Sequence, residues 1–306
     1  AMAASYMTGY RLAMIMAGAG ALALAAWLGS NNGYDYRGWQ LTYLLMGGLM
    51  SLGILTTLMS HEPQIDLKSQ DEQQMARKAT LLARGWSPTL AGLGAWTYEA
   101  IWCPFADFFR RYGSSALLIL GLIACYRISD VVMGVMSNSF YVDLQFSKTE
   151  VATITKVYGV IMTLVGAALG GVLVMRFGTL RILFLGAVLT ASTNLLFALL
   201  NEVGHNLELL TLIISLDNLS AGIATAAFVT YLSSLTNVAF SATQYALFSS
   251  IMLLLPKLLA GFSGRVVELI GYSHFFIGTS LLGIPVMILI IMVAKRGSTL
   301  SPQTHK

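Results

Sequence analysis

Two opposite charges lie near the middle of an apolar stretch that is long enough to cross a membrane. The stretch is Ser115–Ser139, and it contains Arg127 and Asp130. Residues spaced three apart lie on neighbouring positions of one helix face, so these two side chains can pair. A charge at mid-bilayer costs about 2.5–3.5 kcal/mol on insertion scales and must therefore face protein or water. The pair predicts a polar site inside a membrane protein, which is typical of a transport pathway.

Three more charged residues fall in other apolar runs at a similar predicted depth. Lys156 lies in the next run along the chain, and Asp217 and Lys257 lie in later ones. With Arg127 and Asp130 they form a layer of cations and acids. Such a layer could bind a carboxylate ligand, and either acid could carry a proton. Salt bridges between helices that only fix packing are the alternative interpretation.

The composition favours a membrane protein. Of 306 residues, 56% are hydrophobic and only 10% are charged, whereas soluble domains have about 25% charged residues. The two cysteines, Cys103 and Cys125, have no ligand-like spacing, so we expect no disulfide, metal site or cofactor. There is no nucleotide-binding loop or hydrolase triad, and the short loops carry few acids beyond Asp143 and Glu150. We therefore expect neither an enzyme nor a nucleic-acid partner.

Eight apolar runs are long enough to span a bilayer. They lack the period-two alternation of barrel strands, and in hydrocarbon every backbone polar group must be satisfied internally, which leaves helices. We predict an all-α integral membrane protein, a bundle of about eight transmembrane helices. The runs are Gly9–Leu28, Trp39–Met59, Ser115–Ser139, Glu150–Met175, Thr179–Leu200, Leu209–Leu235, Thr243–Phe262 and Tyr272–Ala294.

One connection between runs is long, and the others are short. It spans His61–Gly113 and carries six of the eighteen Lys and Arg residues. Basic residues favour the cytoplasmic side, and placing the connector there also puts the Arg176–Arg181 turn and the C-terminus inside. Within the connector, Gln64–Arg84 is predicted to be a polar linker. Thr97–Tyr112 mixes aromatic and charged residues, as an interfacial helix does.

This connector divides the runs unevenly. We predict two helices in residues 1–60, a cytoplasmic connector with an interfacial helix in 61–113, and six helices with a short cytoplasmic tail in 114–306. The division resembles a transporter of two six-helix halves, with only the last two helices of the first half present. The first residues lack a Met start and a signal-peptide layout, so we expect that an N-terminal part is absent.

Short-range signals predict how the helices begin, pack and bend. Ser147–Glu150 has the form of a capping box at a helix start. Gly166 and Gly170 make a small-residue step that permits close helix packing. Pro256 removes a backbone hydrogen bond and should kink its helix.

The turn after the fourth run resembles a family motif. Gly171, Arg176, Gly178 and Arg181 are similar to the cytoplasmic loop motif G-x-L-x-D-R-x-G-R of the major facilitator superfamily, with Met175 where the motif usually has Asp. The resemblance implies a major-facilitator-like bundle in which this loop contributes to gating. A basic turn that follows the positive-inside bias is the plainer alternative.

A narrower resemblance covers essentially the whole chain. The segments YRISD, FSKTEVATITKVYG, PFADFFRRYG and TGYRLAMIMAGAGALALA are similar to regions of the AmpG-type muropeptide permeases, whose fifth to twelfth helices the chain would cover. The resemblance implies proton-driven import of anhydromuropeptides across a bacterial inner membrane during cell-wall recycling. Its implied partners are this substrate, protons, the lipid bilayer and the N-terminal half of the same transporter.

Two alternatives stay open. The acetyl-CoA transporter relatives share part of the pattern, so the chain could come from another permease for anionic solutes. From a different class, it could be a non-transporting membrane scaffold or sensor, or an inactive fragment. In that case the buried charges could be neutralised as pairs without loss.

Overall fold

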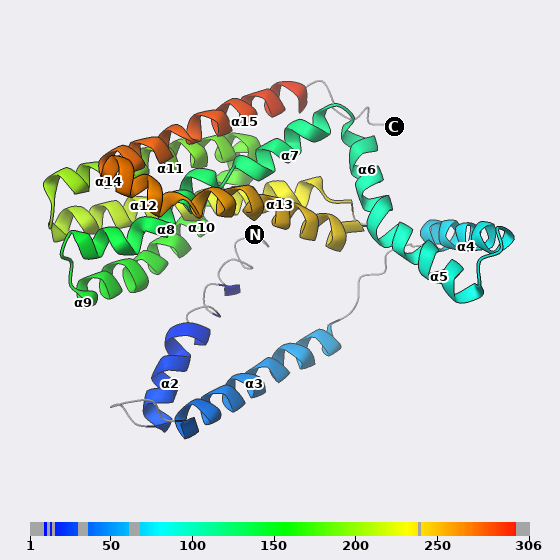
Figure 1. The fold of residues 1–306 in the computed structure, drawn as a ribbon, viewed down its shortest axis with the longest axis horizontal. Helices are drawn as coiled ribbons and strands as arrows, with labels where there is room; N and C mark the ends of the chain where they lie inside the picture. Colours follow the sequence, from blue (N-terminus) through cyan, green and yellow to red (C-terminus); the bar gives the residue numbers. More distant parts are fainter. Residues whose placement is uncertain are drawn as a thin grey trace. The chain divides into compact units, whose positions relative to one another are not determined.

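This computed structural model describes residues 9–10, 13, 16–29, 36–60, 68–237 and 240–297. All regular elements within these ranges are helices (Figure 1). The chain divides into two compact units, one ending with the helices before residue 61 and the other starting with the helix at residue 68. Seven helical segments among the described residues are long and apolar enough to cross a membrane. The predicted all-α membrane fold is confirmed.

The first unit contains two packed helices. A short π-helix, η1 (Met16–Gly20), and α2 (Ala21–Leu28) precede α3 (Tyr36–Met59), which is a candidate membrane span. The two helices meet closely at Gly38, where a Cβ would lie 2.9 Å from a backbone oxygen of α2. The second predicted run is therefore confirmed as a helix. The first, Gly9–Leu28, lies partly outside the described residues.

The described part of the connector is mostly helical, with a short turn between its first two helices. Its elements are α4 (Lys68–Ala83), α5 (Pro88–Thr97), η2 (Tyr98–Trp102) and α6 (Cys103–Tyr112). The stretch predicted as a polar linker is thus largely a helix, and α4 packs against α5. The segment predicted as interfacial is helical throughout, and its location at a membrane surface stays a prediction.

Six predicted runs form the rest of the second unit. The spans follow one another through short turns, and four of them, the third, fourth, seventh and eighth, are made of more than one element. The elements are α7 (Ser115–Cys125), α8 (Ile128–Asp143), α9 (Lys148–Val151), η3 (Ala152–Tyr158), α10 (Gly159–Phe177), α11 (Thr179–Val203), α12 (Leu207–Leu235), α13 (Ser241–Ala260), α14 (Ser263–Leu281) and α15 (Gly283–Gly297).

Consecutive spans run in opposite directions. At one end, α6, the start of α11, the end of α12 and the end of α15 line one cavity, and Figure 1 shows α15 ending near the junction of α6 and α7. At the other end, the Phe146 ring stacks on His205 with centroids 4.4 Å apart, and Tyr272 donates to Asp143 at 2.6 Å. We call these the connector end and the loop end. They fix an up-and-down bundle.

Glycines let α10 and α12 pack with their backbones in contact. A Cβ on Gly166 would lie 2.2 Å from the Leu219 carbonyl oxygen, and one on Gly222 would lie 2.3 Å from the Thr163 carbonyl oxygen. A Cβ on Gly170 would also be too close, at 2.8 Å from a backbone atom of α12. The packing role predicted for the Gly166–Gly170 step is confirmed.

The predicted capping box starts the fourth span. The backbone N–H and the hydroxyl of Ser147 both donate to Glu150 Oε2 at 2.8 Å, and the Glu150 N–H lies 3.3 Å from the Ser147 hydroxyl oxygen. These hydrogen bonds from Ser147 hold the pKa of the Glu150 carboxyl below its usual value. The helix of this span therefore begins where the sequence predicts.

Two spans are interrupted within the bundle. The third breaks at Tyr126–Arg127, between α7 and α8, and the seventh breaks at Gly261–Phe262, between α13 and α14. α13 stays helical past Pro256 to Ala260, so the interruption lies after the proline and not at it. Gly271 makes the turn into the last span with φ 77°, a left-handed conformation that favours glycine.

Candidate functional site

The break in the third span places the central charge pair. Arg127 has φ −97° and ψ 9° and directly precedes α8, and Asp130 lies in the first turn of that helix. The sequence predicted one continuous helix here, because a break of two residues leaves the apolar pattern unchanged. A carboxylate in the first turn is stabilised by the positive end of the helix dipole. The break therefore creates an electrostatic environment that a continuous helix would not offer.

The ion pair expected from the spacing is present. Arg127 Nη2 donates to Asp130 Oδ2, and each side chain is 27% exposed. A pair with this exposure is neither sealed in the core nor fully solvated. A group that arrives from outside the bundle can therefore reach both side chains.

Flanking side chains fix the break to three other helices. The Tyr126 ring stacks on Phe228 of α12, with centroids 4.4 Å apart, and its hydroxyl donates to the Leu183 carbonyl of α11 at 3.2 Å. The Ser129 hydroxyl donates to the Thr279 carbonyl of α14 at 2.7 Å. The backbone around Arg127 is therefore held on both sides, which orients the pair.

Two adjacent residues of α11 connect the charged helices. Asn194 is fully buried, and its amide donates to the Ser129 hydroxyl at 2.9 Å. Its neighbour Thr193 donates to Asp217 Oδ1 of α12 at 3.0 Å. These adjacent residues of α11 therefore contact Asp217 and Ser129, the neighbour of Asp130. In the sequence, Asn194 is visible only as a polar residue within an apolar run.

The pocket beside the pair is small. Tyr126, Arg127, Ser129 and Asp130 line it together with residues of α11, α12 and α15, and its volume is about 20 Å³. That volume holds roughly one water molecule, whereas pockets for organic ligands have about 300–1,000 Å³. Beside the charge pair, the described residues therefore leave no room for a large solute.

The two lysines predicted to belong to the site, Lys156 and Lys257, lie in different helices. Lys156 lies in the π-helical segment η3, and its side chain is outside the described part of the structure. π-Helical segments occur frequently at functional sites, and the Tyr158 hydroxyl fixes this one to Ser215 of α12 at 3.0 Å. The Lys257 side chain is exposed and forms no ion pair within the described residues. The structure therefore does not bring Lys257 to the pair.

The loop motif forms the turn between α10 and α11. Gly178 has φ 88°, so a residue with a side chain would be strained there. Arg176 and Arg181 are exposed, and the Arg176 guanidinium lies 5.5 Å from the centre of the Phe177 ring. Gly171 lies within α10. The tight turn explains Gly178, and the gating role of the motif stays a prediction.

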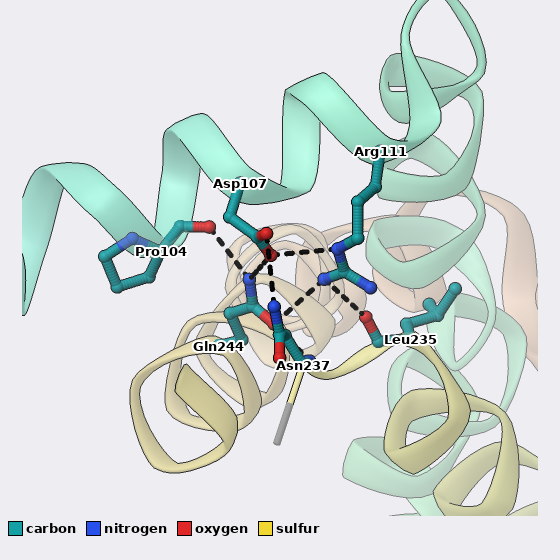
Figure 2. A network of polar contacts seen from close by, with 6 residues as sticks. All are labelled: Pro104, Asp107, Arg111, Leu235, Asn237 and Gln244. Atoms are coloured by element: carbon teal, nitrogen blue, oxygen red, sulfur yellow. Dashed lines mark hydrogen bonds and ion pairs between the residues drawn. The ribbon is translucent and has the colours of Figure 1, made fainter. Parts of the chain in front are cut away.

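A second polar cluster ties the connector to the bundle at the connector end. Figure 2 shows Gln244 of α13 below α6, where its amide donates to the Pro104 carbonyl at 2.9 Å and to Asp107 Oδ2 at 3.0 Å. Arg111 donates from Nε to the same carboxylate oxygen at 2.8 Å and from Nη2 to the Leu235 carbonyl at 3.1 Å. We call these residues, together with Asn237, the α6 latch.

The latch satisfies a side chain that would otherwise be costly. Gln244 is fully buried, and its Oε1 accepts from the Asn237 N–H at 2.7 Å and from Arg111 Nη2 at 3.1 Å. A buried amide without partners would cost about 1–3 kcal/mol. The sequence predicted only that α6 belongs to an interfacial helix. It could not find the latch because Asp107 and Gln244 are 137 residues apart.

Known transporters are similar to this chain in sequence. No protein-family model matches the chain. It is 30% identical over 293 residues to the putative transporter AmpG 4 of Rickettsia felis, covering 96% of this chain and 64% of that protein. It is also 30% identical over 291 residues to the anhydromuropeptide permease of Escherichia coli strain K12, covering 95% of this chain and 52% of the permease. This chain is a homologue of the AmpG-type permeases.

The chain spans about half to just under two thirds of the length of these AmpG-type relatives. Their names describe a transporter and a permease, in agreement with the prediction that the chain is not an enzyme. With seven candidate spans among the described residues, the chain is a multi-pass membrane protein.

The structure gives a physical role to each residue of YRISD, the segment that carried much of the AmpG-type resemblance. Tyr126 and Ser129 fix the break to neighbouring helices, Ile128 is buried in the core, and Arg127 and Asp130 form the pair. Within these five consecutive residues, three pack against or bond to neighbouring helices and two form the ion pair.

Proposed function

We propose that the protein containing this chain imports anhydromuropeptides into the cytoplasm of a bacterium, together with protons, for cell-wall recycling. The homologous permease of Escherichia coli supports the substrate class. The multi-pass bundle supports a transport role. An ion pair at a helix break inside a membrane span supports a polar pathway, because charges at that depth mark ion and substrate routes.

The observation that carries the proposal is the partly exposed Arg127–Asp130 pair. Muropeptides carry carboxylates, and a guanidinium binds carboxylates through strong, charge-assisted hydrogen bonds. A substrate carboxylate that draws a neighbouring cation away from Asp130 would let this acid take up a proton. In this mechanism Asp130 or Asp217 carries the proton, and the competition for the cation couples the two cargoes.

We place the substrate between this bundle and an N-terminal half of the same transporter. The pocket beside the pair has room for about one water, so a muropeptide needs further walls. Transporters of this kind bind their substrates between repeats near the bilayer midplane. The exposed side chain of Lys257 fits this arrangement, because it would face that pathway. In the proposed orientation, the connector end and the C-terminus are cytoplasmic.

The test is uptake of a labelled anhydromuropeptide by cells that lack their own permease and express the full-length protein. Asp130→Asn should abolish uptake, because it leaves Arg127 without its carboxylate partner and removes a proton carrier. Asp143→Asn is the matched control, since it makes the same change at the loop end of the same helix. Uptake that survives Asp130→Asn unchanged would refute the role of the pair.

A purely structural role for the pair is the competing interpretation, and the small pocket favours it. The double variant Arg127→Gln with Asp130→Asn separates the two. If the pair only fixes the break, neutralising both partners should restore folding and uptake together. If the pair belongs to the pathway, the double variant should fold and still fail to transport. Uptake of labelled acetyl-CoA instead of the muropeptide would point to the other anionic-solute permeases.

A further inference from the structure

A second cavity lies at the connector end of the bundle, apart from the charge pair. Its volume is about 310 Å³, and residues of α6, α7, α11, α12 and α15 line it. This size falls within the range of pockets that hold organic ligands. Nothing in the proposed transport mechanism uses it.

The cavity has a basic side and an apolar side. Arg111 and Arg296 lie in the last turns of α6 and α15. The apolar wall includes Leu118, Leu180 and Val293. No acidic side chain is among the described residues that line it. Such a cavity suits an amphipathic anion, with its charge at the arginines and its apolar part along the leucines.

A buried hydroxyl in the wall lacks a partner. Tyr231 of α12 is 5% exposed, and its hydroxyl makes no hydrogen bond within the described part of the chain. Leaving a buried hydroxyl unpaired costs about 1–3 kcal/mol, so such groups nearly always have an acceptor or donor. An oxygen of a bound ligand would provide one.

The α6 latch holds one of the arginines in place. Figure 2 shows the Arg111 guanidinium between Asp107 and the Leu235 carbonyl, to which it donates at 2.8 and 3.1 Å. Leu235 itself lines the cavity. A cation that is already oriented loses little conformational freedom when an anion binds.

We propose that this cavity binds an anionic phospholipid of the leaflet at the connector end. The phosphate lies near Arg111 and Arg296, a headgroup or ester oxygen accepts from the Tyr231 hydroxyl, and an acyl chain follows the apolar wall. Basic pockets between membrane helices bind anionic headgroups in this way. The inference does not depend on the substrate or on the proposed transport activity.

Native mass spectrometry of the purified full-length protein, titrated with phosphatidylglycerol, measures this binding. Arg296→Gln should weaken it about fivefold, which corresponds to one basic residue near a lipid surface. Tyr231→Phe should weaken it by up to about tenfold, because it removes one hydrogen-bond donor to the lipid. Arg110→Gln is the matched control: Arg110 lies beside Arg111 in the last turn of α6, is exposed and does not line the cavity. It should bind as the unchanged protein does.

Three outcomes would overturn the proposal. Phosphatidylcholine binding as tightly as phosphatidylglycerol would show that the arginines do not select charge. Equal losses in Arg110→Gln and Arg296→Gln would show nonspecific attraction to a basic surface. Inorganic phosphate displacing the lipid at equal concentration would make the cavity a small-anion site. Because Arg296 is exposed, its variant tests the proposal even if Tyr231→Phe unfolds the protein.

Discussion

Asp130 is stabilised by two sources of positive potential. One is the Arg127 guanidinium, and the other is the first turn of α8, in which the residue lies. The arginine is in turn held by a neighbour three residues away on the same segment. A guanidinium bound in this way exchanges partners less readily than a flexible ammonium does. This difference favours Lys156 over Arg127 as the cation that exchanges partners.

We predict that Lys156 exchanges between Asp130 and a substrate carboxylate during the transport cycle. Lys156→Gln should raise the apparent KM about tenfold, the cost of one charge-assisted hydrogen bond, and should shift the pH profile of uptake through Asp130. Lys156→Arg should keep binding but slow turnover. The measurement is uptake against concentration and pH, with Lys148→Gln of α9 as the control. An unmoved KM and pH profile in Lys156→Gln would leave the lysine a structural residue.

At the scale of elements, the spans could be predicted from the sequence and their interruptions could not. Apolar runs locate membrane helices because hydrocarbon penalises polar groups wherever they occur along the chain. The break at Tyr126–Arg127 contains no glycine or proline and is held by tertiary contacts, such as the stacking of Tyr126 on Phe228. The α6 latch is likewise invisible to local patterns. Spacing predicted the Arg127–Asp130 pair, but not the break that orients it.

The close contact of α10 and α12 gives a test of packing. Gly166→Ala should lower the thermal stability of the purified protein, because the added Cβ would lie 2.2 Å from the Leu219 carbonyl oxygen. Overpacking of this kind costs about 1–3 kcal/mol. The control is Gly134→Ala of α8, where a Cβ meets nothing within 4 Å and helix propensity favours alanine. Equal effects of the two variants would argue against a backbone contact between the helices.

At the scale of the whole molecule, the contacts at the two ends of the bundle fix alternating directions for the spans. Arg111, Leu180, Leu235 and Arg296 meet at one end, so all four must lie on the same side of the membrane. The orientation relative to the cytoplasm rests on the distribution of basic residues, which gather on the connector side.

We predict that the connector end is cytoplasmic. In a protein whose native cysteines are replaced, Val142→Cys at the loop end should react with an impermeant maleimide on intact cells. Gln74→Cys in α4 should react only after lysis. Burial raises the pKa of the native Cys103 thiol and so slows its alkylation, but its replacement removes any background labelling. Labelling of Gln74→Cys without lysis would reverse the orientation.

The α6 latch also decides where the chain can be cut or extended in protein engineering. Gly85 and Gly113 are both exposed turn glycines with positive φ, and at neither would an added Cβ meet another atom within 4 Å. Judged by their surroundings alone, they are equivalent insertion points for a fluorescent reporter. Gly113, however, joins α7 to the helix that Gln244 and Arg111 fasten to the bundle, so an insert there would pull against those bonds. Gly85, between α4 and α5, is the position where a reporter leaves the bundle undisturbed.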